Sequence, residues 1–456
     1  MMEFVDAALK FQVAMSSFAA QRVLGVLPGS NTETVKAAQE KLYRTGEAAK
    51  KVFMTNTALF GAFQFADKAQ SALASFASDT LSGKVLSPSY LKHVAESSVH
   101  LASDAVGALG SSHSRDLLKD QFGNTFDVIG FVNHVSAPKH LAEDGTYPLD
   151  EMVKQCYSHG DYPALWYVEG LGERYATAYL NDSLATGKEL HGLLTTGKML
   201  AADQKIQTMM HAGIGIIFAK HAVGQLTPWS TDGEIQAAVE VFTTLVNNNS
   251  LPGCIGAALE SLGLVSRTWH GQLVARISAV LKATNQDLYE FFWHGCGRAM
   301  YFSPMYMMPG LSPWDAADSE PTEETARRNA RAGVAWAFTI VNSRHPDIAA
   351  NFLRHKAERI ADNDAYTNGV YSTLTMATDM VPGHRFVRAF GTFQPEDAPG
   401  LASWNKQIGL GAGMKIDKIH ADLSAANKLG EVFRYHEDLP SYAAAQAAQA
   451  AVPAAE

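Results

Sequence analysis

The stretch YEFFWHGCGRAMYFSP at residues 289–304 decides how the chain is interpreted, because its glycine-centred pattern recurs. Related stretches are EGLGERYA (169–176), HAGIGIIFA (211–219), GCIGAALE (253–260), ARAGVAWAF (330–338) and, more weakly, TNGVYSTL (367–374). The anchor glycines of these stretches are Gly172, Gly215, Gly256, Gly297, Gly333 and Gly369, with steps of 43, 41, 41, 36 and 36 residues. A period of about 40 residues is typical of stacked helical hairpins. We therefore predict an all-α fold with an α/α helical-repeat domain, either an open solenoid or a closed toroid.

The anchor glycines also predict how the helices pack. A glycine inside a helix costs about 1 kcal/mol relative to alanine, so glycine at a recurring position indicates a packing need. Either neighbouring helices approach closely there, or the backbone approaches a ligand. More polar helical patterns lie between these stretches, at 232–246, 271–283 and 344–361. The alternation predicts inner helices of small residues and amphipathic outer helices.

Residues 1–85 form a predicted amphipathic helical arm that precedes the repeats. Apolar residues at helical spacing indicate two helices in this arm. In the second helix, apolar residues recur every seven positions. They are Phe4, Phe11, Met15 and Phe18 in the first helix, and Val52, Phe53, Leu59, Phe60, Phe63, Ala66 and Leu73 in the second. The apolar face predicts either a helical pair packed on the main domain or an arm that adheres to a partner helix or an apolar surface.

The remaining segments complete the predicted domain organisation. Residues 86–150 are a connecting helical and turn segment, which ends in the turn-rich SAPKHLAEDGTYP. The repeat domain occupies 151–400 and a C-terminal helical extension 401–440. We predict that the Ala-rich tail at 441–456 is disordered.

Composition restricts the partners and the compartment. The chain has 456 residues, 47% of them hydrophobic and 18% charged, with a net charge of -9. No dense basic patch occurs, so we expect no nucleic-acid partner. The three cysteines are far apart and form no C-x-x-C motif, which favours a reducing compartment. The N-terminus has acidic residues where a signal peptide is basic, and no run of about 18 apolar residues predicts a transmembrane span. We therefore expect a cytoplasmic protein.

Polar residues of the recurring stretches are the candidate catalytic groups: Glu169, His211, His294 and Arg298. If the inner helices line a cavity, Glu169 and His294 form an acid/base pair and Arg298 binds a carboxylate or phosphate. The candidate ligand-binding residues around them are Trp166, Arg174, Trp293, Cys296, Tyr301, Phe302, Arg331, Trp336 and Tyr366. The alternative is that these polar groups satisfy helix ends and inter-helix contacts. Aromatic residues in such positions usually form core, but they can also line an apolar pocket.

Other kinds of site receive little support from the sequence. The histidine spacings match neither H-E-x-x-H nor a zinc-finger pattern, so we predict no metal site. Cys296 lies between His294 and Arg298, which can lower the pKa of a thiol, but a lone cysteine among aromatics is more often buried and inert. The chain has no P-loop, G-x-S-x-G or Rossmann fingerprint, and the sequence identifies no cofactor.

About half of the chain, residues 160–380, resembles a bacterial family of unknown function found in enediyne biosynthesis gene clusters. WYVEGLGERYATAYL (166–180), HAGIGIIFA, FFWHGCGRAMYFSP (291–304) and ARAGVAWAFTI (330–340) are similar to its glycine-rich blocks. Gly295, Gly297, Arg298 and Phe302 match the most specific block, and His211 matches another. Ile216 stands where an aromatic residue is usual, and His294 replaces a Gln-like position. The family has no assigned reaction, so the resemblance implies little mechanism.

The arm and the tail are similar in composition to phasins, which coat bacterial polyester granules with Phe/Ala-rich amphipathic helices. This resemblance and the repeats lead to two hypotheses. The first is an accessory protein that binds a hydrophobic small molecule, or a granule or lipid surface, in bacterial lipid, polyester or polyketide metabolism. The second is an enzyme of natural-product or lipid processing with a central Glu/His/Arg site. Homo-oligomers through the N-terminal helices are a further expectation.

Overall fold

The computed structural model describes residues 112–200, 202–302, 311–360, 364–409 and 412–451. The chain divides into two compact units, one formed by Met1–Gly123 and Ser303–Ser312, the other by Asn124–Phe302 and Pro313–Glu456. The second unit contains all six anchor glycines. The predicted arm at 1–85 lies outside the described residues.

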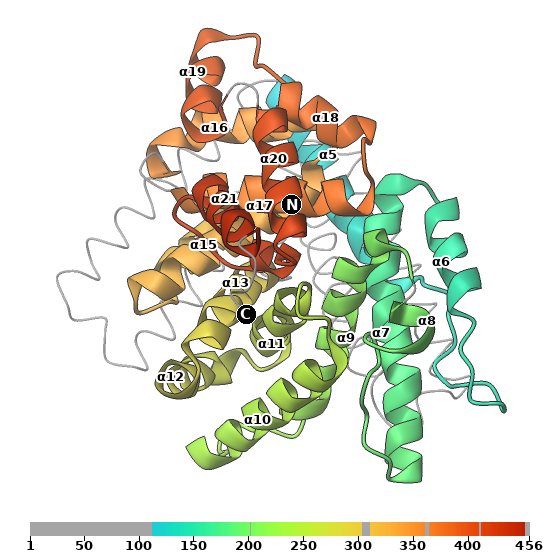
Figure 1. Ribbon diagram of the computed structural model, residues 1–456. Helices are drawn as coiled ribbons and strands as arrows, with labels where there is room; N and C mark the ends of the chain where they lie inside the picture. The colour runs from blue at the N-terminus through green and yellow to red at the C-terminus, as the bar shows by residue number, and fades with distance from the viewer. Residues whose placement is uncertain (1–111, 201, 303–310, 361–363, 410–411, 452–456) are drawn as a thin grey trace, which may run out of the picture. The chain divides into compact units, whose positions relative to one another are not determined.

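The recurring stretches form six long helices, each of which carries one anchor glycine. They are α7 (Asp161–Thr186), α9 (Gln204–Val223), α11 (Ile255–Trp269), α13 (Gln286–Phe302), α15 (Glu324–Asn342) and α17 (Asp364–Met380). Each of these helices packs against the next one in chain order (Figure 1). The glycine-bearing helices therefore make up the core of the unit.

The anchor glycines lie where neighbouring helices touch, as their recurrence predicts. A Cβ atom on Gly297 of α13 would overlap the carbonyl oxygen of Ala330 on α15. A Cβ atom on Gly333 of α15 would in turn overlap the carbonyl oxygen of His294 on α13. Only glycine permits this backbone-to-backbone approach. The predicted close packing of the helices is confirmed.

Four further helices alternate with the last five glycine-bearing helices along the chain. They are α10 (Asp232–Asn249), α12 (Val274–Thr284), α14 (Leu311–Ser319) and α16 (Pro346–Ile360). The helix α10 begins with a capping box, in which Thr231 and Glu234 bond each other's backbone N–H groups. It packs on α9 and on α12, and α12 packs on α13. The alternation of inner and amphipathic outer helices and the solenoid or toroid arrangement stay predictions.

The N-terminal part of the described chain contributes α5 (Ser112–Asn133), α6 (Leu149–Ser158) and the short α8 (Gly197–Leu200). A 3₁₀ turn, η2 (Gly271–Leu273), joins α11 to α12. The C-terminal part forms α18 (Arg385–Thr392), α19 (Ala398–Gln407), α20 (Ala412–Ala425), the 3₁₀ helix η4 (Leu429–Phe433) and α21 (Leu439–Ala450). Since α20 packs on α17 and η4 packs on α11, these elements belong to the same compact unit as the recurring helices.

The C-terminus differs from the prediction of a disordered tail. The helix α21 begins at Leu439 after Asp438, whose side chain accepts a hydrogen bond from the Ser441 N–H. Leu439 and Ala443 are buried, and the helix packs against α20. Alanine has the highest helix propensity. An Ala-rich segment therefore forms a stable helix when a neighbouring helix packs on one of its faces.

The all-α prediction is confirmed for the part of the chain that the structure describes, in which no strand occurs. None of its helices combines the length and the apolar character needed to cross a membrane.

Candidate functional site

Four charged or ionisable side chains meet in the interior of the second unit. We call Glu169 of α7, Glu260 of α11, and His294 and Arg298 of α13 the central ionic cluster. Three of its members are candidate catalytic residues of the sequence analysis, and Glu260 is new. The crossing of α11 and α13 brings them together. A Cβ atom on Gly295 would overlap the Glu260 carbonyl oxygen, so the two helices lie close enough for their side chains to meet.

Arg298 links the two carboxylates of the cluster. Its Nη1 donates to Glu260 Oε2 at 2.6 Å, and its Nη2 donates to Glu169 Oε1 at 3.2 Å. The guanidinium carbon lies 4.5 Å from the centre of the Trp336 ring, which adds a cation–π contact. Burial disfavours the charged guanidinium, but the two carboxylates outweigh this effect and raise the pKa of Arg298 above its ordinary value.

His294 completes the cluster from the same helix, one turn before Arg298. Its Nδ1 lies 2.5 Å from Glu260 Oε1, so Glu260 contacts His294 with one oxygen and Arg298 with the other. The other ring nitrogen, Nε2, is buried and has no hydrogen-bond partner among the described residues. The His294 ring also stands edge-on to Trp336, with ring centres 6.5 Å apart.

The central ionic cluster is closed to solvent. The exposed fraction is 0% for Glu260 and His294, 2% for Arg298 and 3% for Glu169. Both carboxylates accept a hydrogen bond from Arg298, whereas His294 Nε2 has no partner among the described residues. In this arrangement the cluster pairs buried charges and joins α7, α11 and α13, and within the described part of the chain His294 and Glu169 present almost no surface to a substrate.

The fourth candidate catalytic residue, His211 of α9, lies apart and has its own partners. Its Nδ1 lies 2.7 Å from the Gln207 carbonyl oxygen, and its Nε2 accepts from the Leu251 N–H at 2.8 Å. These contacts fix the neutral tautomer with the proton on Nδ1. Burial lowers the pKa of His211 to about 4, although the bond to Gln207 acts in the opposite direction. The side chain connects α9 to the segment before α11, as the structural alternative in the sequence analysis expects.

The aromatic candidates for ligand binding are packed inside the unit. The side chains of Trp166, Trp293, Tyr301, Trp336 and Tyr366 are buried, and Phe302 is half-buried. Several have specific partners in the core. Trp293 Nε1 donates to Ser278 Oγ at 3.0 Å, Tyr301 OH lies 3.2 Å from Thr125 Oγ1, and the Tyr366 ring stacks on Phe352. They fill the spaces between helices in this structure.

The other candidate ligand-binding residues are distributed rather than gathered. Arg331 pairs with Asp318, and Arg174 is half-buried on α7. Cys296 is fully buried, and its thiol lies 3.6 Å from the Gly263 carbonyl oxygen. Burial raises the pKa of Cys296 well above the ordinary value, so the thiolate that a nucleophile requires is disfavoured.

Glu260 was missed by the sequence reasoning, although the signal was present. It ends the recurring stretch GCIGAALE and is the sole charged residue between Leu251 and Ser266. An acidic residue inside such an apolar run needs a buried partner. The partner itself was not visible from sequence, because the pairing with Arg298 depends on how α11 and α13 cross.

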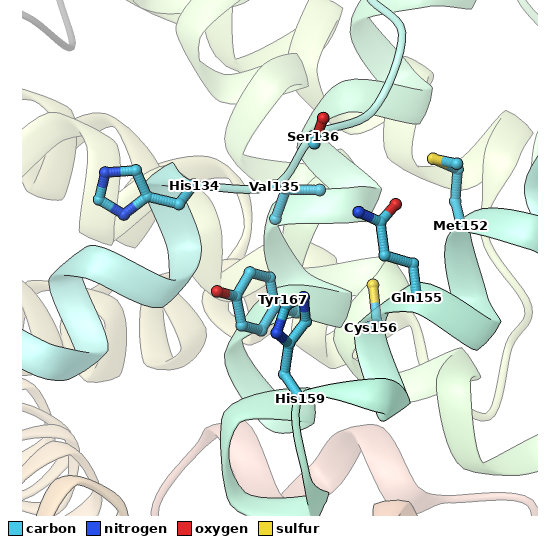
Figure 2. Close-up of a pocket in the computed structure, with 8 residues that line it drawn as sticks. All are labelled: His134, Val135, Ser136, Met152, Gln155, Cys156, His159 and Tyr167. Atoms are coloured by element: carbon cyan, nitrogen blue, oxygen red, sulfur yellow. The ribbon is translucent and has the colours of Figure 1, made fainter. Parts of the chain in front are cut away.

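A small pocket lies beside the end of α5 and is bounded by α6 and α7 (Figure 2). Its lining residues are His134, Val135, Ser136, Met152, Gln155, Cys156, His159 and Tyr167. The cavity volume is about 10 Å³, which holds about one water molecule. His159 stacks on Tyr167 at 4.4 Å between ring centres and closes one side. The pocket is too small for a substrate or cofactor.

In the described part of the chain, no group of three or more His, Cys, Asp or Glu side chains is arranged to hold a metal ion. The chain matches no protein-family model, no curated protein and no solved structure at a significant level.

Proposed function

We propose that the protein is an accessory protein that binds an apolar surface through its N-terminal segment, with the second unit as a closed helical scaffold. The apolar surface is a lipid or polyester phase of bacterial cytoplasm, which is consistent with the resemblances of the sequence to phasins and to the enediyne-cluster family. The alternative is an enzyme, which requires the candidate catalytic residues of the sequence analysis to lie in a site that a substrate can reach.

The closed centre of the second unit carries this proposal. Arg298 bonds both Glu169 and Glu260, His294 contacts Glu260, and all four residues are at most 3% exposed. The aromatic candidates are likewise engaged in the core. These contacts support a scaffold role, because the carboxylates pair with Arg298 within the protein and the aromatic rings pack in its core, where they are buried from solvent.

The N-terminal segment is the part of the sequence with an apolar face of its own. Its second predicted helix repeats apolar residues every seven positions, with phenylalanines beside them. Helices of this type bind apolar interfaces in proportion to the apolar area that they bury. The described residues expose few large hydrophobic side chains, namely Leu184, Trp229, Val241 and Met414. The arm is therefore the stronger candidate for surface binding.

Flotation of the full-length chain with triolein emulsion droplets tests the proposal. The variant Leu59→Gln/Phe60→Gln/Phe63→Gln removes three apolar residues of the arm, and we expect a loss of binding of at least tenfold. Each buried side chain contributes about 1.5–3 kcal/mol, so three account for such a loss.

The matched control is Trp229→Gln, which removes an aromatic side chain that is 87% exposed in the second unit. We expect this variant to float like the wild type. If the wild type does not bind droplets, or if the arm variant binds as well as the wild type, the proposal is wrong. Dissociation of an oligomer in the arm variant, without any droplet binding by the wild type, would assign the arm to self-association instead.

A further inference from the structure

Three exposed arginines of the second unit have no carboxylate partner among the described residues. They are Arg385 and Arg388 of α18, and Arg344, which lies between α15 and α16. Most other arginines whose side chains the structure describes pair with an aspartate or a glutamate, as Arg276 does with Asp232. A surface guanidinium that its own protein leaves unpaired is available to an anion from outside.

An aromatic contact brings the three arginines to one region of the surface. The Arg344 guanidinium carbon lies 3.9 Å from the centre of the Tyr162 ring of α7. The same ring packs edge-on against Phe386 of α18, with ring centres 5.7 Å apart. Arg385 directly precedes Phe386, and Arg388 follows Arg385 by three residues on the exposed side of the helix. We call Arg344, Arg385 and Arg388 the arginine patch.

The residues beneath the arginine patch are held firmly. Tyr162 is 3% and Phe386 7% exposed. The Tyr162 hydroxyl donates to the Val341 carbonyl oxygen at 2.7 Å, which ties α7 to the end of α15. The Phe386 N–H donates to His384 Nδ1 at 3.3 Å at the start of α18. The three arginines therefore extend from a fixed base, which lowers the entropy that they lose when they bind a ligand.

The acidic groups near the arginine patch do not neutralise it. Asp161 Oδ2 at the start of α7 lies 2.9 Å from His384 Nε2. Asp127 of α5 lies near the tyrosine of the base and has a further interaction of its own. Asp347, three residues after Arg344, forms no ion pair with it in the described part of the chain. Since arginine keeps its charge at every physiological pH, the patch is positive.

We propose that the arginine patch binds the headgroups of anionic phospholipids and so orients the second unit on a lipid surface. This inference rests on the proposed binding to a lipid phase, and it adds the headgroup class that the second unit contacts. Guanidinium groups bind phosphate oxygens with two parallel hydrogen bonds. Each cationic side chain close to an anionic lipid surface strengthens binding about fivefold.

A phospholipid surface suits this patch better than a nucleic acid does. Proteins that bind DNA through its backbone contact about six to ten phosphates, and the patch offers three arginines. The whole chain has a net charge of -9, so its remaining surface repels a long polyanion. A lipid surface presents separate headgroups that three arginines can contact singly. Repulsion from the rest of the protein is screened beyond about 10 Å at about 0.1 M salt.

Flotation of the full-length chain with two kinds of vesicle tests the proposal. One kind is pure phosphatidylcholine, and the other contains about 30% phosphatidylglycerol as the anionic lipid. We expect the wild type to prefer the anionic vesicles at least about tenfold at about 0.1 M salt, and this preference to weaken as salt is added. The variant Arg344→Gln/Arg385→Gln/Arg388→Gln loses the preference.

The matched control is Arg276→Gln/Arg328→Gln/Arg354→Gln. It removes the same charge from arginines that are paired with Asp232, Glu324 and Asp397. We expect it to prefer anionic vesicles as the wild type does. The proposal is overturned if the wild type shows no preference, or if the patch variant keeps it. Binding of polyuridylate RNA that depends on the patch, without a vesicle preference, likewise overturns it and assigns the patch to nucleic acid.

The triolein droplets of the preceding experiment carry no anionic headgroups, so the two proposals can fail separately. We expect the patch variant to bind these droplets as the wild type does. Droplet binding without any preference for anionic vesicles contradicts the arginine patch alone. A vesicle preference that depends on the patch, without droplet binding, contradicts the proposed role of the arm alone.

Discussion

Arg298 Nη1 lies 2.6 Å from Glu260 Oε2 in the interior of the second unit, and this pair is the centre of the central ionic cluster. The two residues come from α13 and α11, which cross at glycines. Arg298 also bonds Glu169 of α7, so one guanidinium joins three helices. Burying such groups is costly, and the cost is offset only while every charge keeps its partner.

We expect Arg298→Met to destabilise the second unit by about 3–5 kcal/mol, because Glu260 and Glu169 then remain buried without their cation. Urea unfolding followed by tryptophan fluorescence measures this change. All seven tryptophans lie in the second unit, so the signal reports that unit alone.

The control for this variant is Arg328→Met on α15. Arg328 pairs with Glu324 at 3.2 Å on the exposed side of the helix. Exposed ion pairs contribute about 0–1 kcal/mol, so we expect little change in the unfolding midpoint. Equal effects of the two variants would contradict a structural role for the buried cluster.

Gly297→Ala tests the helix crossings. The new Cβ atom overlaps the Ala330 carbonyl oxygen, and backbone atoms cannot yield as a flexible side chain can. We expect a loss of about 1–3 kcal/mol in the free energy of unfolding. Gly233→Ala on α10 is the control, since its nearest neighbour is Thr231 Oγ1 at 3.9 Å. That variant is unchanged or up to about 1 kcal/mol more stable.

The lowered pKa of His211 predicts that the stability of the fold decreases at acidic pH. Burial lowers its pKa to about 4, whereas an unfolded histidine titrates near about 6.5. Below about pH 6.5 the unfolded chain takes up a proton that the folded chain does not, so stability falls as the pH decreases towards 4. The full contribution is about 3 kcal/mol. His211→Gln keeps an acceptor for the Leu251 N–H, and its unfolding free energy falls less between pH 6.5 and 4.

The three cysteines, Cys156, Cys254 and Cys296, are predicted to be unreactive in the native protein. Each is buried, and burial raises the pKa of Cys156 and Cys254 to about 12 and raises that of Cys296 well above its ordinary value. A thiol reagent therefore modifies three cysteines only after denaturation. Rapid native modification of Cys296 would restore it as a candidate nucleophile.

Glycine spacing was the most informative feature of the sequence. It predicted six helices and their close packing, because a residue without Cβ is needed wherever two helix backbones touch. The anchor glycines at 297 and 333 illustrate this, each lying against a carbonyl of the opposite helix. The need for glycine at a helix contact can therefore be inferred from the sequence alone.

The polar site was harder to predict, because its pairing depends on three-dimensional contacts. Nothing in the spacing of Glu260 and Arg298 shows that they meet, and nothing around His211 shows that its partners are the backbone groups of Gln207 and Leu251. The tail that we predicted to be disordered forms the helix α21 instead. Its order depends on a tertiary contact, since α21 packs against α20. Burial and pairing are decided by packing that a single sequence does not display.

Native mass spectrometry of the full-length protein, purified gently from its own host, tests most directly whether the centre of the second unit is filled by its own side chains. The account predicts the mass of the chain, 49.2 kDa per copy, with no stoichiometric small molecule that depends on the central ionic cluster. Apolar molecules retained in varying amounts, and lost in the Leu59→Gln/Phe60→Gln/Phe63→Gln variant, agree with binding by the arm. A stoichiometric ligand that is lost in folded His294→Ala or Glu169→Ala protein would contradict the account.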